Sequence, residues 1–228
     1  MIVLLPVYKP GDHLPDLVEE LRDADPAKHV LIVDDGSGAA ADDVLAAADD
    51  GPHVTVLRHP TNRGKGIAIK TGLTWVHENF PDHDAVTADA DGQHSVADIL
   101  RVAERVDSTG RLVLGVRRFD TDVPARSRFG NTLTRVLFRA ATGRDVRDTQ
   151  TGLRGYPAAL IPWLRDVTGE RFEYEMNTLL EAARAGHPVE EVTITTTYLA
   201  GNRSSHFGSL SDSVRIYRPL LLSLMRLR

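Results

Sequence analysis

Short apolar runs alternate with helical patterns through the first half of the chain. The runs are rich in Val, Ile and Leu, which is typical of strands buried on both faces of a parallel sheet. The expected strands are 2–7, 30–33, 54–57, 85–88 and 112–116, and the expected helices are 14–22, 40–48, 66–78 and 96–106. This rhythm predicts an α/β fold: a Rossmann-like, doubly wound, mostly parallel sheet with helices on both faces.

The second half of the chain has fewer strand signals. Beyond residue 120 the pattern predicts helices near 129–141 and 173–185 and a strand near 192–198. The chain has 228 residues and contains no internal repeat or linker, so we expect a single domain over 1–218 followed by a short apolar and basic tail at 219–228.

Composition excludes several classes of function. The chain has no cysteine, which removes disulfides, thiolate catalysis and Cys-based metal sites and fits a reducing cytoplasm. A net charge of −5 argues against a general nucleic-acid binder. Residues 101–154, however, hold 12 arginines against 6 acids. This excess indicates a local anion site, unless arginine is simply the cation that this protein uses on its surface.

Polar residues follow the predicted strands at the edge where ligands bind in such sheets. Asp89 and Asp91 follow the strand 85–88 and bracket the small residue Ala90. Two carboxylates there can face one hard cation, Mg²⁺ or Mn²⁺, which would relieve their mutual repulsion. The structural alternative is that one aspartate caps the helix starting near Ser95.

Two further segments at this edge suit a nucleotide. Asp34 and Asp35 begin a D-D-G-S turn, where carboxylates can accept hydrogen bonds from a ribose or a base, although an ordinary Asp-Gly turn explains them as well. The segment 62–66, N-R-G-K-G, opens the next helix with glycines and cations suited to an anion.

In combination, these motifs resemble the inverting family 2 glycosyltransferases of GT-A fold. The first set comprises P-V-Y at 6–8, V-D-D-G-S at 33–37, N-R-G-K-G at 62–66 and D-A-D-G-Q-H at 89–94. A second set resembles the branch of dolichyl-phosphate mannosyltransferases and polyprenyl-phosphate glycosyltransferases: G-V-R-R at 115–118, R-S-R-F-G-N at 126–131, D-T-Q-T-G-L-R-G at 148–155 and N-R-S-S-H-F at 202–207.

This resemblance implies a role for each matching residue. The donor nucleotide-sugar would be held by Pro6, Tyr8, Asp34, Asp35, Asn62, Gly64, Lys65, Asp89, Ala90 and Arg203. The metal ligands would be Asp89, Asp91, Gln93 and His206, with a loop histidine packing on Phe207 as the alternative for His206. The acceptor would meet Arg117, Arg126, Ser127 and Arg154, and catalysis would depend on Asp91, Arg117 and Arg154.

One motif departs from the family pattern. The family commonly reads P-x-Y/F-N-E near residue 10, whereas Tyr8 is followed here by Lys9 and Pro10. The missing Asn and Glu weaken any inference about which nucleotide is bound, UDP or GDP.

The expected reaction is metal-dependent, inverting transfer of a hexose from a nucleotide-sugar to a polyprenyl or dolichyl phosphate. A phosphate acceptor is already an anion and needs cations, which the arginines can supply. A hydroxyl acceptor would need a general base, and Glu173 and Glu175 are then the candidates, although both also suit a helix start.

The C-terminal segment 215–228 has an apolar stretch flanked by arginines. This pattern suits the interface of an anionic membrane, and so we expect a cytoplasmic protein that is peripheral at the membrane. The segment is equally compatible with packing on the body of the protein or in a homodimer.

Two other function classes compete with a glycosyltransferase. A nucleotidyltransferase would carry a Gly-rich, basic N-terminal loop, and residues 6–13 show none. A non-catalytic nucleotide-sugar-binding protein would have little reason to keep Asp89, Asp91, Arg154 and Arg203.

Overall fold

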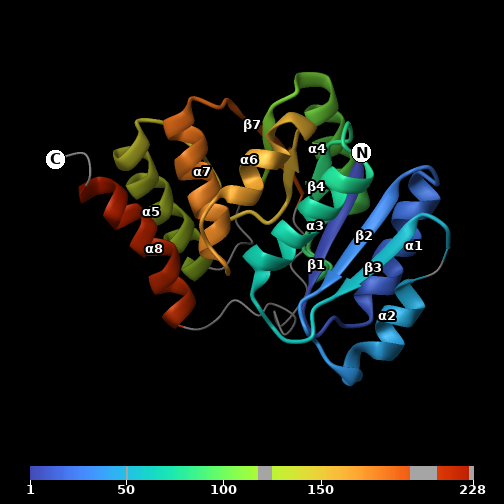
Figure 1. The fold of residues 1–228 in the computed structure, drawn as a ribbon. Coiled ribbons are helices and arrows are strands. Elements are labelled where there is room, and N and C mark those ends of the chain that lie inside the picture. The colour runs from blue at the N-terminus through green and yellow to red at the C-terminus, as the bar shows by residue number, and fades with distance from the viewer. Residues whose placement is uncertain (50, 118–124, 196–209, 226–228) are drawn as a thin grey trace.

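The computed structural model describes residues 1–49, 51–117, 125–195 and 210–225, with backbone only at 125–129 and 210–216. Its centre is one seven-stranded sheet in the order β3-β2-β1-β4-β6-β5-β7 (Figure 1). The strands are β1 Ile2–Val7, β2 His29–Asp34, β3 Val54–Arg58, β4 Ala85–Thr87, β5 Leu112–Arg117, β6 Arg154–Tyr156 and β7 Val189–Ile194. All neighbours pair parallel except that β6 runs antiparallel to both β4 and β5. The mostly parallel sheet predicted from the sequence is confirmed.

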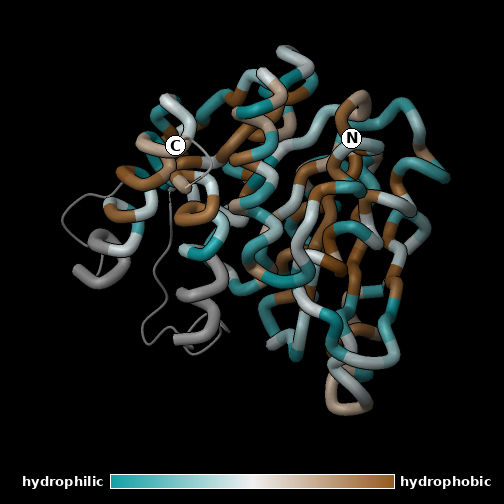
Figure 2. The backbone as a smooth tube through the Cα atoms, turned by 60° about the vertical axis from the view of Figure 1, so that its left-hand side comes forward, coloured by the Kyte–Doolittle hydropathy of each residue, from teal (hydrophilic) through white to brown (hydrophobic). Residues whose placement is uncertain are grey.

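Helices cover both faces of the sheet. One face packs against α1 His13–Ala24, α2 Asp42–Ala48 and α4 Val96–Thr109. The other packs against α3 Lys65–Asn79, α5 Ala125–Thr142, α6 Ile161–Asp166, α7 Glu173–Ala185 and α8 Leu210–Met225. Two short 3₁₀ turns, Ala39–Ala41 and Ala158–Leu160, precede α2 and α6. In Figure 2 the hydrophobic strands lie inside this arrangement.

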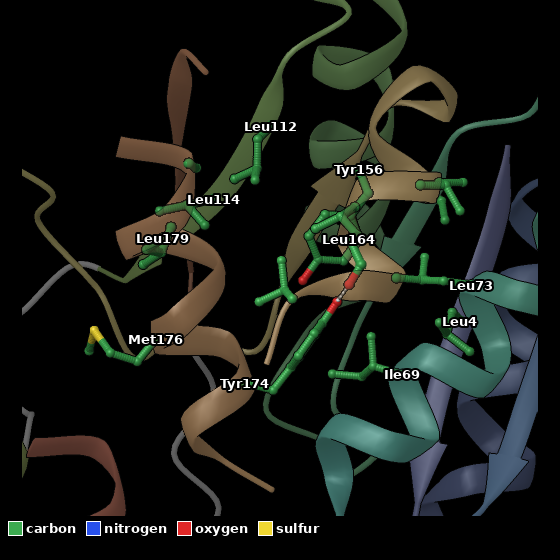
Figure 3. Close-up of a cluster of buried hydrophobic side chains, with 14 of the residues drawn as sticks. Leu4, Ile69, Leu73, Leu112, Leu114, Tyr156, Leu164, Tyr174, Met176 and Leu179 are labelled. Atoms are coloured by element: carbon green, nitrogen blue, oxygen red, sulfur yellow. Dashed lines mark hydrogen bonds between the residues drawn. The ribbon is translucent and has the colours of Figure 1, made fainter. Parts of the chain in front are cut away.

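Alternation along the strands divides the core into two layers. In β1, Leu4 faces the α3 side while Val3 and Leu5 face the α1 side, and all three are fully buried. Each such side chain contributes about 1.5–3 kcal/mol through burial. On the α3 side, Figure 3 shows Tyr174 reaching through the layer to donate a hydrogen bond of 3.0 Å to the carbonyl of Leu164. This contact ties α7 to α6.

Several elements differ from the sequence expectation. The antiparallel strand β6 and the helix α6 were not expected, and β7 begins at Val189 rather than near residue 192. Residues 196–198 of the expected strand lie outside the described residues. The boundary expected between residues 218 and 219 falls inside α8, where Leu220 is fully buried and Ser223 accepts a hydrogen bond of 2.8 Å from Arg184 of α7. The expected tail thus begins within a helix that packs on the domain.

Candidate active site

The carboxyl ends of β1, β2, β4 and β5 gather at one edge of the sheet, and the predicted site residues follow these strands. Lys9, directly after β1, has a left-handed backbone (φ 50°), and its N–H donates a 2.7 Å hydrogen bond to Ser37 after β2. Its ammonium lies 5.3 Å from the centre of the Tyr8 ring. Pro6 pairs with Val33 inside the sheet. The hydrogen bond from Lys9 to Ser37 therefore connects the carboxyl ends of β1 and β2.

Asp89 lies directly beyond β4 and contacts a largely buried cation. Lys65 Nζ, at the first residue of α3, is 2.7 Å from Asp89 Oδ1 and 3.2 Å from Glu175 Oε2 of α7. Burial alone would lower the pKa of Lys65, but the charges of Asp89 and Glu175 outweigh it and raise that pKa. Burial would raise the pKa of Asp89, but Lys65 and then His94 lower it. Asp89 is therefore held as a carboxylate.

Asp91 has the opposite electrostatic environment. Burial, followed by the charge of Asp89, raises the pKa of Asp91. Its carboxylate accepts hydrogen bonds from the Gln93 N–H at 3.1 Å and from Gln93 Nε2 at 2.7 Å. Gln93 thus supports Asp91 through its amide nitrogen. Two carboxylates this close in the sequence offer the oxygen donors that suit Mg²⁺ or Mn²⁺.

Neither aspartate caps the following helix. The cap of α4 is Ser95, whose Oγ accepts a hydrogen bond of 3.2 Å from the N–H of Asp98. The capping alternative considered for Asp89 and Asp91 is therefore wrong. Within the described ranges, no three His, Asp or Glu side chains are grouped as a metal site.

His94 is a site residue that the sequence interpretation did not single out. It is 7% exposed, and its Nε2 lies 4.0 Å from Asp89 Oδ2. Burial lowers its pKa. The sequence signal that could have identified His94 is its position at the end of the D-A-D-G-Q-H motif.

Arg117, at the end of β5, forms a two-point ion pair with Asp148. Arg117 Nε and Nη2 donate hydrogen bonds of 2.6 and 2.9 Å to the fully buried Asp148 carboxylate. The charge of Arg117 contributes to lowering the pKa of Asp89, so the cation lies near Asp89. Asp148 was missed as a functional residue, although it begins the D-T-Q-T-G-L-R-G motif.

Arg154 is placed differently from the expectation. It is fully buried in β6, and its guanidinium donates to the carbonyls of Thr151 (2.9 Å), Glu175 (2.7 Å) and Thr149 (3.1 Å). Its Nε is also 3.7 Å from Glu175 Oε1. In this arrangement Arg154 organises the backbone beneath the site and does not face an open acceptor position.

Asp34 and Asp35 are both buried and engaged by the protein itself. Asp34 accepts hydrogen bonds from the N–H and the hydroxyl of Ser37 and from Arg58 Nε. Asp35 accepts from the N–H groups of Arg63 (2.9 Å) and Gly64 (2.7 Å) and contacts His59 Nδ1 at 2.8 Å. The carboxylate of Asp35 therefore fixes the loop that leads into α3.

Close packing holds the 62–66 loop in place. Gly64 has a φ of 104°, and a Cβ there would lie 2.5 Å from the carbonyl oxygen of Glu170. Asn62 accepts a hydrogen bond of 3.1 Å from Arg171, which belongs to the segment before α7. The loop expected to border the nucleotide thus contacts both Asp35 and the segment before α7.

An arginine-rich cavity of about 600 Å³ adjoins Arg117. It lies between α5 and the ends of β5 and β7, and its cationic lining is Arg117, Arg135, Arg139 and Arg147. Three of these cations are ion-paired: Arg117 with Asp148, Arg135 with Asp145 and Arg147 with Glu191. Arg139 is exposed. Arg126 and Ser127 lie in the first turn of α5 with backbone only described, and Arg203 and His206 lie outside the described residues.

Residues 2–162 match the family model described as glycosyl transferase family 2. The chain belongs to this family. The glycosyltransferase is 29% identical to the polyprenol monophosphomannose synthase of Mycolicibacterium smegmatis, over 86% of this chain and 77% of that protein. It is 31% identical to the undecaprenyl-phosphate mannosyltransferase of Micrococcus luteus, over 86% of this chain and 82% of that protein.

A solved structure supports the fold assignment. The glycosyltransferase superposes on glucosyl-3-phosphoglycerate synthase of Mycobacterium tuberculosis, crystallised with Mn²⁺, UDP-glucose and phosphoglyceric acid. The TM-score is 0.65 at 16% identity, covering 99% of this chain and 78% of that one. The GT-A fold expected from the sequence is confirmed.

Proposed function

We propose that this glycosyltransferase moves a hexose from a UDP- or GDP-linked donor to a polyprenyl or dolichyl phosphate, with inversion at the anomeric carbon and with Mg²⁺ or Mn²⁺. The observation that carries the proposal is the Asp89/Asp91 pair beside Arg117 and its cationic cavity. The relatives named for polyprenol and undecaprenyl-phosphate mannosyl transfer support the lipid acceptor.

Asp89 and Asp91 would hold the cation together with the donor diphosphate. When bound, a divalent ion offsets the charge that develops on the leaving nucleoside diphosphate. Asp34 and Asp35 shape the nucleoside pocket by fixing the turns after β2 and before α3. Tyr8, Asn62 and Gly64 would border the nucleoside. From the family resemblance, Arg203 would contact the diphosphate and His206 would complete the metal site, with Gln93 orienting Asp91.

A phosphate acceptor fits the charges around the site. A phosphate monoester attacks as an anion and needs positioning cations rather than a base. Arg117 is oriented by Asp148 for this purpose, and Arg126 and Ser127 would join it from α5. Glu175, the alternative base for a hydroxyl acceptor, is buried between Lys65 and Arg154 and is poorly placed to take a proton from an acceptor.

The exposed large hydrophobic side chains of the described residues all lie on α5 and α8. They are Leu133, Val136, Leu221, Leu222 and Met225. The two helices pack against each other on one side of the molecule (Figure 1). Within the described part of the chain, no helix is both long and apolar enough to cross a membrane. From these exposed apolar side chains, and from the exposed Arg139 and Arg218 on the same two helices, we propose that this side meets the surface of an anionic membrane.

The test is a matrix of donors and acceptors. UDP- and GDP-hexoses are each offered with a short polyprenyl phosphate or the corresponding prenol, with Mg²⁺, with Mn²⁺ or with a chelator. The wild type is compared with Asp91→Asn and with Asp107→Asn, a control that neutralises an exposed aspartate at the far end of α4. We expect a glycosyl phospholipid only with the phosphate and the metal. We also expect Asp91→Asn to lose at least 10²-fold in rate while Asp107→Asn keeps the wild-type rate.

Other outcomes would contradict separate parts of the proposal. Transfer only to the prenol would refute the phosphate acceptor and return Glu173 and Glu175 to consideration. Undiminished transfer in the presence of the chelator would refute the proposed metal dependence. Donor binding without turnover under every condition would favour the non-catalytic binding protein.

A further inference from the structure

Lys65 occupies a position that a divalent cation would have to share. Its ammonium lies 2.7 Å from Oδ1 of Asp89, a proposed metal ligand, and it is largely buried. At such separations two positive charges repel appreciably wherever water is partly excluded. An internal cation therefore already neutralises half of the aspartate pair when no donor is bound.

Lys65 is held in this position from both ends. Its backbone begins α3 directly after Gly64, whose N–H is bound by Asp35. Its side chain also contacts Glu175, 3.2 Å away on α7, and Glu175 lies next to the fully buried Arg154. Leaving the site would break the contact of Lys65 with Oε2 of the buried Glu175, which is unfavourable. The ammonium therefore stays near Asp89 when other groups bind.

The donor diphosphate changes the balance of charge around Asp89 and Lys65. It brings negative charge between the ammonium and the cation position, so both positive charges gain a partner. We infer that Lys65 couples metal binding to donor binding: it weakens divalent-cation binding at Asp89/Asp91 in the free enzyme, and a nucleoside diphosphate relieves this weakening. This inference rests on the proposed metal site. Coupling of this kind is reciprocal, so the metal raises donor affinity by the same factor.

The experiment measures Mn²⁺ binding to the full chain by electron paramagnetic resonance, alone and with saturating UDP or GDP, corrected for Mn²⁺ bound to free nucleotide. For the wild type we expect the Mn²⁺ Kd to fall at least tenfold with one nucleotide, within the usual range of about 5–150-fold for coupled sites. Lys65→Met should bind Mn²⁺ about tenfold more tightly than wild type without nucleotide, and its nucleotide effect should be smaller than that of the wild type, because only the direct attraction between Mn²⁺ and the diphosphate remains. Lys65→Arg keeps the charge and should retain most of the coupling.

Lys70→Met is the matched control. Lys70 lies on the same helix but stacks over the Tyr174 ring at 5.2 Å, away from Asp89, so this variant should show the wild-type Kd values. Thermal unfolding of each variant shows whether it is folded.

Each remaining outcome decides against the inference. A folded Lys65→Met with wild-type Kd values would overturn it. So would weaker Mn²⁺ binding by the same factor with and without nucleotide, because that result indicates a purely structural lysine. If the wild type binds no Mn²⁺ even with UDP or GDP, the proposed metal site itself fails. This result is distinguishable because it is seen before any variant is made.

Discussion

Asp148 is fully buried and binds the guanidinium of Arg117 at two points, 2.6 Å from Nε and 2.9 Å from Nη2. The pair joins the end of β5 to the segment before β6, and the side chain of Arg117 retains 18% exposure. An arginine held in this way has little freedom left to lose when it meets an anion. Orientation of Arg117 is therefore the function that we assign to Asp148.

Neutralising Asp148 should be costly. Asp148→Asn removes the charge from a buried pair, and we expect it to lower the free energy of unfolding by about 3 kcal/mol. Asp145→Asn breaks the exposed pair with Arg135, where both side chains are 41% exposed, and should cost less than about 1 kcal/mol. Urea unfolding of both variants provides the comparison. Equal losses in the free energy of unfolding would show that the buried Arg117–Asp148 pair contributes no more to stability than the exposed Arg135–Asp145 pair.

Gly152 should be essential for the position of Asp89. A Cβ at residue 152 would lie 2.1 Å from Asp89 Oδ2, so Gly152→Ala must displace that carboxylate. We expect the transfer rate to fall on the order of 10²-fold, because small displacements of reacting groups have effects of this size. Gly130→Ala, on α5 with open space around it, should keep full activity. A fully active Gly152→Ala would mean that the position of Asp89 in this structure is not the one used in catalysis.

His29 should make stability depend on pH. Burial, and then His53, lowers the pKa of His29, whose ring contacts Thr55 at 2.9 Å and packs near Trp75 and Phe80. The unfolded chain then binds a proton more readily than the folded chain, so stability is lost as pH falls through about 6.5 and below. The urea midpoint of the wild type should therefore fall more between pH 8 and pH 5.5 than that of His29→Gln. A larger fall in the variant would contradict this sign.

The apolar side of α8 should determine membrane binding. Leu221→Asp/Met225→Asp places two charges on exposed positions and should abolish cosedimentation with anionic vesicles without unfolding the chain. The control Ala40→Asp/Ala46→Asp adds the same charge to exposed positions near and on α2, at the other side of the molecule (Figure 1). If both double variants bind vesicles equally, α8 is not the membrane contact.

Much of the fold was predictable because the parallel strands are strongly apolar and the helices between them are periodic. The strand at Ile2–Val7 and the helix at Glu173–Ala185 match the expected bounds. β6 was missed because its three residues, Arg-Gly-Tyr, form no apolar run, whereas the equally short β4 is mostly apolar. Its position depends on pairing with β4 and β5 rather than on its own sequence.

The site was predictable as a set of positions but not as a set of contacts. Strand ends and motifs identified Asp89, Asp91 and Arg117, since the fold brings such positions together. The sequence offered no sign that Arg154 would be buried or that Lys65 would pair with Glu175. These partners are separated by many residues along the chain and meet only after the helices have packed. A sequence pattern does not report which distant residues come into contact.

The insertion of β6 between β4 and β5 has a consequence for synthesis on the ribosome. In the final sheet β4 and β5 each pair with β6 and not with each other, so a nascent chain ending before residue 154 leaves one edge of β4 unpaired. Asp89 beyond β4 and Arg117 at the end of β5 have by then been translated, but β6, which lies between these two strands, has not. Exposed strand edges invite association with other chains. A ribosome stalled in this interval would therefore display an inactive, aggregation-prone intermediate, and catalytic competence must arise late in translation.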